Sequence, residues 1–202
     1  MRRTKEQAAE TRHLLLLSAE ALFLDKGYEN VTLDEIAAAA GASRGALHWH
    51  FCNKQGLLAA LRDKAQVPLQ ELADALKTDI TADPLDLLGK TISMMFLDLH
   101  NDERRRGLIR VMKHLEISKS CDLNLGRHRN EPYLAIAQIF VEANKKQRLA
   151  APWTPRMAAC ALTAALIGLV EEWALERSEF QLVPYGQDLI LSIIASFTSR
   201  RV

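Results

Sequence analysis

Residues 37–58, AAAAGASRGALHWHFCNKQGLL, contain two apolar segments separated only by Gly41, Ala42 and Ser43. Glycine commonly ends a helix, and serine commonly caps the start of the next one. The stretch therefore predicts two short helices joined by a tight turn. This is the spacing of a helix-turn-helix, in which the second helix enters the DNA major groove.

The preceding sequence predicts the supporting helices. Thr32 is followed three residues later by Glu35, which is the pattern of a capping box at a helix start. Residues 5–25 are expected to form a long helix that ends at Gly27 and has one buried stripe. The stripe comprises Leu15, Ala19, Leu22 and Phe23.

The charge pattern of this region points to a polyanion. No acidic residue lies between Glu35 and Asp63, while Arg44, Lys54 and Arg62 give this segment a charge of +3 in a chain whose net charge is +1. Cations with no intervening acids favour contact with phosphates.

Several side chains in the segment suit DNA contact. Thr32, Ser43 and Asn53 each begin a predicted helix, where free backbone N–H groups attract phosphate. Arg44 opens the second helix of the motif, and arginine is the usual partner of guanine. The remaining candidates are Gly45, which permits close backbone approach, the ring N–H donors His48, Trp49 and His50, and Lys54. The His-x-His pattern could instead bind a metal, but no third ligand lies nearby.

The rest of the chain also has helical patterns, so the predicted fold is all-α. A helix from about residue 53 to 78 is expected to be shared by the two halves, and Pro132 is expected to kink or break a later helix. The further predicted helical segments are 84–100, 102–117, 122–149, 153–176 and 183–201.

Composition and motifs exclude several classes of protein. The three cysteines are odd in number and widely spaced, which favours a reducing cytoplasm over a disulfide framework. We find no signal peptide and no uninterrupted apolar window of about 18 residues, so we expect no membrane partner. The chain has no P-loop, GxGxxG, HExxH or GxSxG motif, so we predict neither an enzyme nor a cofactor.

Residues 5–62 resemble the N-terminal signature of the TetR family of repressors. The resemblance is carried by TRHLLLLSAEALFLDKGYENVTLDEIAAAAGASRGALHWHFCNKQGLLAAL, with His48 at a position where the family usually has tyrosine. It implies a helix-turn-helix domain over residues 1–62 and a ligand-binding and dimerisation domain over 63–202. It also implies operator DNA contacts at Thr32, Ser43, Arg44, Gly45, His48, Trp49, His50 and Lys54.

Three segments further resemble the AcrR/TtgR-type repressors of multidrug efflux pumps: RRTKEQAAETR, DERRRGLIRVMKHLEI and AALIGLVEEWALERSEFQL. MKHLEI and the pair Glu176-Arg177 depart from that group's pattern. The resemblance implies repression of efflux genes and release by a small hydrophobic molecule. One alternative is a TetR-type repressor of catabolic or lipid-metabolism genes that responds to an acyl or other metabolite. Another is a helical adaptor or an enzyme that does not read DNA.

Two half-sites require two copies of the motif, so we expect a homodimer formed through helices 155–177 and 185–200. The alternative for the apolar helix 155–177 is the buried centre of a monomer. Large apolar residues and two polar ones are the candidates for the effector site, although each could be ordinary core. They are Met94, Met95, Phe96, Met112, His114, Glu116, Phe140 and Trp173. The shared helix 53–78 is expected to carry the effector signal.

Overall fold

The computed structural model describes residues 5–64, 67–79, 81–118, 131–176 and 179–198, and the side chains of 114–118 and 131 lie outside this description. Regular structure in these residues is helical, apart from one isolated β-bridge between Leu149 and Thr198. The predicted all-α class is confirmed. Contacts divide the chain into two compact units, Met1–Ala65 with Gly107–Leu123, and Gln66–Arg106 with Asn124–Val202.

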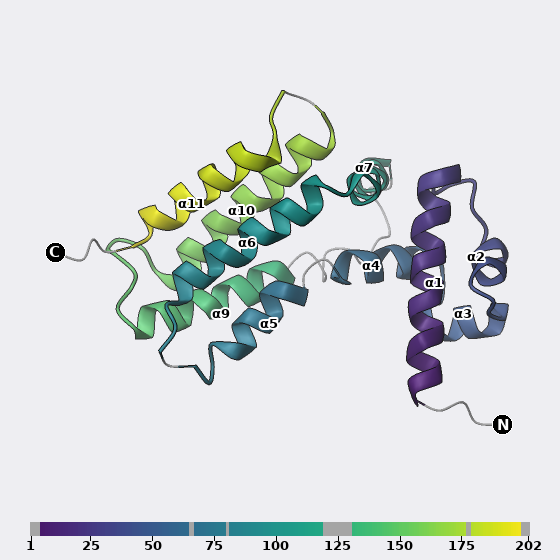
Figure 1. Cartoon of the computed structure of the whole chain (residues 1–202), viewed down its shortest axis with the longest axis horizontal. Coiled ribbons are helices and arrows are strands. Elements are labelled where there is room, and N and C mark those ends of the chain that lie inside the picture. Colours follow the sequence, from purple (N-terminus) through teal and green to yellow (C-terminus); the bar gives the residue numbers. More distant parts are fainter. Residues whose placement is uncertain (1–4, 65–66, 80, 119–130, 177–178, 199–202) are drawn as a thin grey trace. The chain divides into compact units, whose positions relative to one another are not determined.

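The N-terminal unit is built from helices α1 to α4 and most of α7 (Figure 1). Their bounds are α1 Lys5–Lys26, α2 Leu33–Ala39, α3 Arg44–Phe51, α4 Lys54–Lys64 and α7 Glu103–Ser118. Leu15, Ala19 and Phe23 of α1 are buried, as the predicted stripe requires, and Leu22 is partly buried. The same core includes Leu47 and Phe51 of α3, so the second helix of the motif is held from its inner side.

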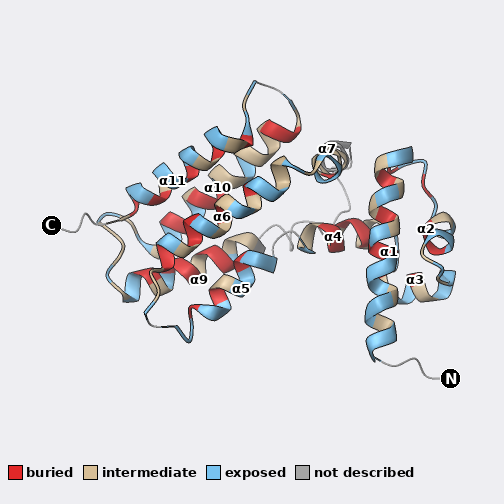
Figure 2. Cartoon of the chain, in the orientation of Figure 1, coloured by how far each residue is buried: buried red, intermediate tan, exposed pale blue. Residues whose placement is uncertain are grey.

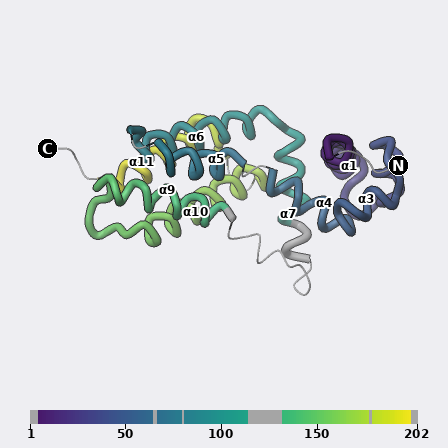
Figure 3. Tube along the Cα trace, turned by 90° about the horizontal axis from the view of Figure 1, so that it is seen from below, coloured from purple at the N-terminus to yellow at the C-terminus, as the bar shows by residue number. Residues whose placement is uncertain are grey.

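The C-terminal unit contains the remaining helices. Their bounds are α5 Val67–Ala75, α6 Pro84–His100, α9 Glu131–Lys145, α10 Pro155–Ala174, the short irregular turn η1 Leu182–Gly186 and α11 Gln187–Ser196. Within this unit α9 packs against α5, α6 and α10, and α11 packs against α6 and α10. Figure 3 shows α9 and α10 lying side by side along one edge of the unit.

One predicted helix differs from the observed ones, and a proline explains the difference. The expected helix 53–78 is described as two helices, α4 and α5, because Pro68 in a continuous helix would clash with the carbonyl of Lys64. Proline fits the first turn of a helix, and Pro68 lies in the first turn of α5. Pro132, which was expected to kink or break a helix, lies in the first turn of α9. The earlier part of that predicted helix, 122–130, lies outside the described residues.

Helix α10 is apolar over most of its circumference. Its most apolar 18-residue window has a mean hydropathy of 1.5, and 33% of that window is buried inside the chain. Its length and composition would suffice to cross a membrane, but the core helix of a soluble protein has the same properties. Figure 2 shows exposed and buried residues alternating along α10 and α11, so each helix has a face that the chain itself leaves uncovered.

Candidate DNA-binding site

The turn between α2 and α3 is formed by local backbone hydrogen bonds and one glycine. The N–H of Ala40 donates to the carbonyl of Ile36 at 3.0 Å, and the N–H of Ala42 donates to that of Ala37 at 2.9 Å. Gly41 has a φ of +62°, a left-handed conformation that glycine adopts without the steric penalty of a side chain. These contacts end α2 and reverse the chain within the few residues that a helix-turn-helix allows.

Three predicted caps define the helix starts at this site. The Oγ1 of Thr32 accepts from the N–H of Glu35 at 3.2 Å, and the Oγ of Ser43 accepts from the N–H of Ala46 at 3.1 Å. The Oδ1 of Asn53 accepts from the N–H of Gly56 at 2.8 Å. All three predicted cap roles are therefore confirmed. Each cap leaves other N–H groups of its first helical turn available to an anion.

Helix α3 has one buried face and one exposed face. Leu47 and Phe51 are buried, whereas Arg44, Gly45, His48 and Trp49 are exposed. The exposed residues follow helical spacing, so they share one face. Trp49 has 74% of its surface exposed, which is unusual for an aromatic residue unless a partner covers it.

His50 differs from the other predicted contacts because it is only half-exposed. Its ring meets the ring of Trp49 edge to face, with centroids 4.5 Å apart, and lies 5.9 Å from the ring of Phe51. His50 thus packs against one side of the Trp49 ring. Within the described part of the chain, no three His, Cys, Asp or Glu residues gather into a possible metal site.

Gly45 is not required by packing inside the chain. A Cβ at this position would meet only the Oγ of Ser43, at 3.9 Å, so there is room for a side chain. Glycine in a helix costs about 0.5–1 kcal/mol relative to alanine. The absence of a side chain on the exposed face fits close approach of another molecule.

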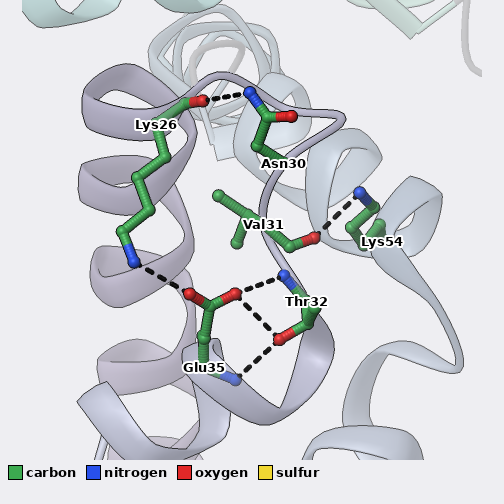
Figure 4. A network of polar contacts seen from close by, with 6 residues as sticks. All are labelled: Lys26, Asn30, Val31, Thr32, Glu35 and Lys54. Atoms are coloured by element: carbon green, nitrogen blue, oxygen red, sulfur yellow. Dashed lines mark hydrogen bonds and ion pairs between the residues drawn. The ribbon is translucent and has the colours of Figure 1, made fainter.

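Lys54 has a role different from the predicted phosphate contact. Its ammonium donates to the main-chain carbonyls of Tyr28 at 2.7 Å, Glu29 at 3.3 Å and Val31 at 2.9 Å, and it lies 4.5 Å from the centre of the Tyr28 ring. An ammonium has three N–H donors, and these contacts use all of them. We therefore revise the prediction: Lys54 holds the loop that leads into Thr32 (Figure 4).

Glu35 completes the same network from the other side of Thr32. It accepts from the backbone N–H and the Oγ1 of Thr32, both at 2.8 Å, and forms an ion pair with Lys26 at 2.8 Å (Figure 4). The hydrogen bond from Lys26, followed by those from Thr32, lowers the pKa of Glu35 to about 2. The pKa of Lys26 is raised by the same hydrogen bond to Glu35. The start of α2 is thereby tied to α1.

Two neighbours of α3 could not be found from sequence spacing. Arg44 donates from Nη1 to Asp34 of α2 at 3.2 Å, and the guanidinium of Arg12 on α1 lies 5.1 Å from the centre of the Phe51 ring. Both contacts join residues on different helices, so they depend on how the helices pack. Arg12 adds a cation beside the end of α3.

The predicted effector residues do not all fall in one place. Met112 packs against the core of the N-terminal unit, which corrects its assignment to the effector site. On α6, Met94 is 67% exposed, Met95 is half-buried and Phe96 is buried, because consecutive helical residues face different directions. The side chains of His114 and Glu116 lie outside the described residues.

The other two candidates are buried in the C-terminal unit with different neighbours. Phe140 meets the Phe197 ring edge to face at 5.3 Å. Trp173 is 4% exposed. The centre of its ring lies 4.7 Å from the guanidinium carbon of Arg106 and 6.4 Å from the centre of the His100 ring. Phe96, Phe140 and Trp173 remain proposed effector residues.

A tight turn, capped helix starts and an exposed helix face bearing Arg44, Gly45, His48 and Trp49 define a helix-turn-helix DNA-binding protein. Residues 15–61 match the family described as bacterial regulatory proteins, tetR family. The chain belongs to the TetR family of transcriptional regulators.

Three similar proteins extend the match beyond the N-terminal unit. The transcriptional repressor BepR of Brucella suis is 30% identical over 97% of this chain and 96% of its own. The regulator TtgR of Pseudomonas putida is 32% identical over 87% of this chain and 85% of its own. Among solved structures, SmeT, the repressor of the Stenotrophomonas maltophilia multidrug efflux pump SmeDEF, has a TM-score of 0.75 and 25% identity, covering 95% of this chain and 93% of that one. SmeT is also known in complex with triclosan.

Proposed function

We propose that this chain is a cytoplasmic, ligand-responsive repressor of multidrug efflux genes, which binds operator DNA as a homodimer and is released by a small hydrophobic molecule. The DNA-binding part of this proposal rests on the exposed residues of α3. Arg44 would read a base edge and His48 and Trp49 would contact phosphates, while Thr32 and Ser43 would present helix N-termini to the backbone. The similarity to SmeT favours efflux genes over catabolic or lipid genes as the target.

The homodimer is supported by the uncovered apolar surface of α10 and α11. Met157 and Ile167 of α10 are 49% and 37% exposed, and Leu189 and Leu191 of α11 are 45% and 44% exposed. The two helices pack against each other, so their exposed residues belong to neighbouring surfaces. A second copy of the chain would cover this apolar surface and bring a second α3 to the other half-site.

Helix α7 is the element that we propose to carry the effector signal, in place of the predicted helix 53–78, which is described as α4 and α5. The division between the two units falls within α7, between Arg106 and Gly107. The Nη2 of Arg106 donates to the carbonyl of Trp173 at 2.9 Å and lies 3.1 Å from Glu176. Arg106 thus fixes one part of α7 to the C-terminal end of α10.

The following residues of α7 belong to the core of the DNA-binding unit. A Cβ at Gly107 would lie 2.7 Å from Leu24 of α1, and Leu108 is buried among the core residues. A ligand that moves Trp173 would therefore move Arg106, and the rigid helix would pass the displacement to α1. The ligand must bind the released conformation more tightly for this to favour release.

The test is fluorescence anisotropy with DNA from upstream of the protein's own gene, with and without triclosan. We expect tight binding to this fragment and release by triclosan or another apolar drug. Tight binding that no drug in a chemically varied set releases would retain the repressor and contradict the multidrug ligand. Arg106→Met should weaken the drug response while DNA affinity is kept. Arg105→Met is the matched control, because among the described residues Arg105 forms its ion pair with the nearby Asp102, at 3.2 Å.

A further inference from the structure

An acidic side chain reaches the DNA-facing end of α3. The Oδ2 of Asp34, in the first turn of α2, accepts a hydrogen bond from the Nη1 of Arg44 at 3.2 Å. Both side chains are open to solvent, with 62% of Asp34 and 73% of Arg44 exposed. Such an exposed pair contributes little to folding stability. Its position at the first residue of α3 points instead to a role in binding.

Asp34 is distinguished from its neighbour Glu35 by its partner. Glu35 is engaged with Lys26 and Thr32, and so stabilises the start of α2. Asp34 is directed to Arg44, and the sequence after Glu35 has no acid before Asp63. One negative charge therefore stands beside an otherwise basic and neutral reading surface.

We propose that Asp34 is a specificity-determining residue of the DNA-binding site, which orients the guanidinium of Arg44 and weakens binding to DNA that offers Arg44 no matching base. This inference rests on the proposed function, since it assigns a role within the same DNA site. Asp34 itself is a positioning residue, because it acts through Arg44.

Two opposing effects of the carboxylate produce this discrimination. Its charge repels phosphates of any sequence, which lowers affinity for all DNA. Its hydrogen bond restricts a long, flexible side chain to one orientation, which lowers the entropy lost when Arg44 pairs with a base. The second effect operates only where the base matches, so the ratio of specific to non-specific affinity rises.

The experiment compares wild type, Asp34→Asn and Asp25→Asn on the native upstream fragment and on random DNA of equal length. Asp25 lies on α1, outside α2 and α3, so its substitution makes the same change in net charge away from Arg44. Asp34→Asn should raise the affinity for random DNA about three- to tenfold and raise the affinity for the native fragment less. The affinity ratio should fall, whereas Asp25→Asn should leave it unchanged.

A double-mutant cycle with Arg44→Met tests whether Asp34 acts through Arg44. We expect Asp34→Asn to leave the affinity ratio unchanged in the Arg44→Met background. An equal rise on both DNAs would mean that Asp34 only competes with DNA for Arg44, and no change on either would mean that the pair is irrelevant to binding. Both outcomes overturn the inference while leaving the proposed function intact. A wild type that does not distinguish the two fragments would overturn the proposed function itself, and the inference with it.

Discussion

The two units of the chain differ in where their polar and apolar side chains find partners. In the N-terminal unit, Glu35 accepts from the N–H of Thr32, and Lys54 donates to the carbonyl of the preceding Val31. In the C-terminal unit, α10 and α11 leave apolar side chains such as Ile167 and Leu189 exposed. The first unit is shaped by contacts within one chain, whereas we propose that a second copy of the chain covers the exposed apolar side chains of the second unit.

The largest expected effect tests this contrast from the C-terminal side. Ile167→Glu places a charge on the uncovered face of α10, so the proposed homodimer should dissociate. The affinity for operator DNA should then fall about 100-fold or more, since one subunit would lose the contacts of the other. Analytical ultracentrifugation and anisotropy measure the two effects. Leu134→Glu is the control, because Leu134 on α9 is exposed but lies outside α10 and α11. A dimer that survives Ile167→Glu would place the interface elsewhere.

An effect of comparable size, on folding rather than on DNA binding, is expected at Gly56, in the first turn of α4. A Cβ there would lie 2.0 Å from the carbonyl oxygen of Phe51, so Gly56→Ala must displace the backbone. We expect a loss of about 3 kcal/mol or more in the free energy of unfolding. Urea denaturation monitored by circular dichroism measures the loss. A Gly56→Ala variant as stable as wild type would contradict the close approach of Gly56 to the carbonyl of Phe51.

Lys54 should contribute less to stability than Gly56 does. Lys54→Met removes three N–H donors from the carbonyls of residues 28, 29 and 31, and should cost about 1.5–3 kcal/mol. The dependence of DNA affinity on salt should keep its slope, because this ammonium is engaged within the protein. If the slope instead falls by about one while stability is unchanged, Lys54 contacts phosphate as the sequence predicted.

A substitution at Gly45 should change DNA affinity without destabilising the fold. Gly45→Ala should leave the N-terminal unit as stable as wild type or up to about 1 kcal/mol more stable, because alanine favours the helix and the position has room. The added methyl group should lower DNA affinity about tenfold, equivalent to about 1.4 kcal/mol. Thermal denaturation and anisotropy on the same preparation check both parts. Unchanged DNA affinity would remove Gly45 from the DNA-binding face.

The smallest effect concerns the ion pair at the start of α2. The pKa of Glu35 is lowered to about 2, so its contribution to stability is present above its ordinary pKa of 4.5 and is lost as the pH falls toward 2. In Glu35→Gln the stability should depend less on pH in this window. Thermal denaturation from pH 5 to pH 2 measures the difference, and parallel profiles for the two proteins would contradict the described network.

The sequence predicted the local features of the N-terminal unit because short-range patterns determine them. The caps at Thr32, Ser43 and Asn53 and the turn at Gly41 depend on residues within five positions of one another. The contacts of Lys54, which is 23 residues from Val31, and of Arg44 with Asp34 depend on helix packing and were not predicted. Met112 was misplaced for the same reason, because periodicity identifies its helix but not the core against which that helix packs.

We propose that the exposed face of α3 reads DNA, and a salt series in the anisotropy assay is the sharpest check of DNA recognition by this chain. Wild-type protein would be titrated onto the native upstream fragment and onto random DNA at several salt concentrations. We predict an affinity for the native fragment about 1,000-fold or more above that for random DNA, and a steep loss of both affinities as salt rises. Equal and weak binding to both fragments, or binding that does not respond to salt, would contradict the account.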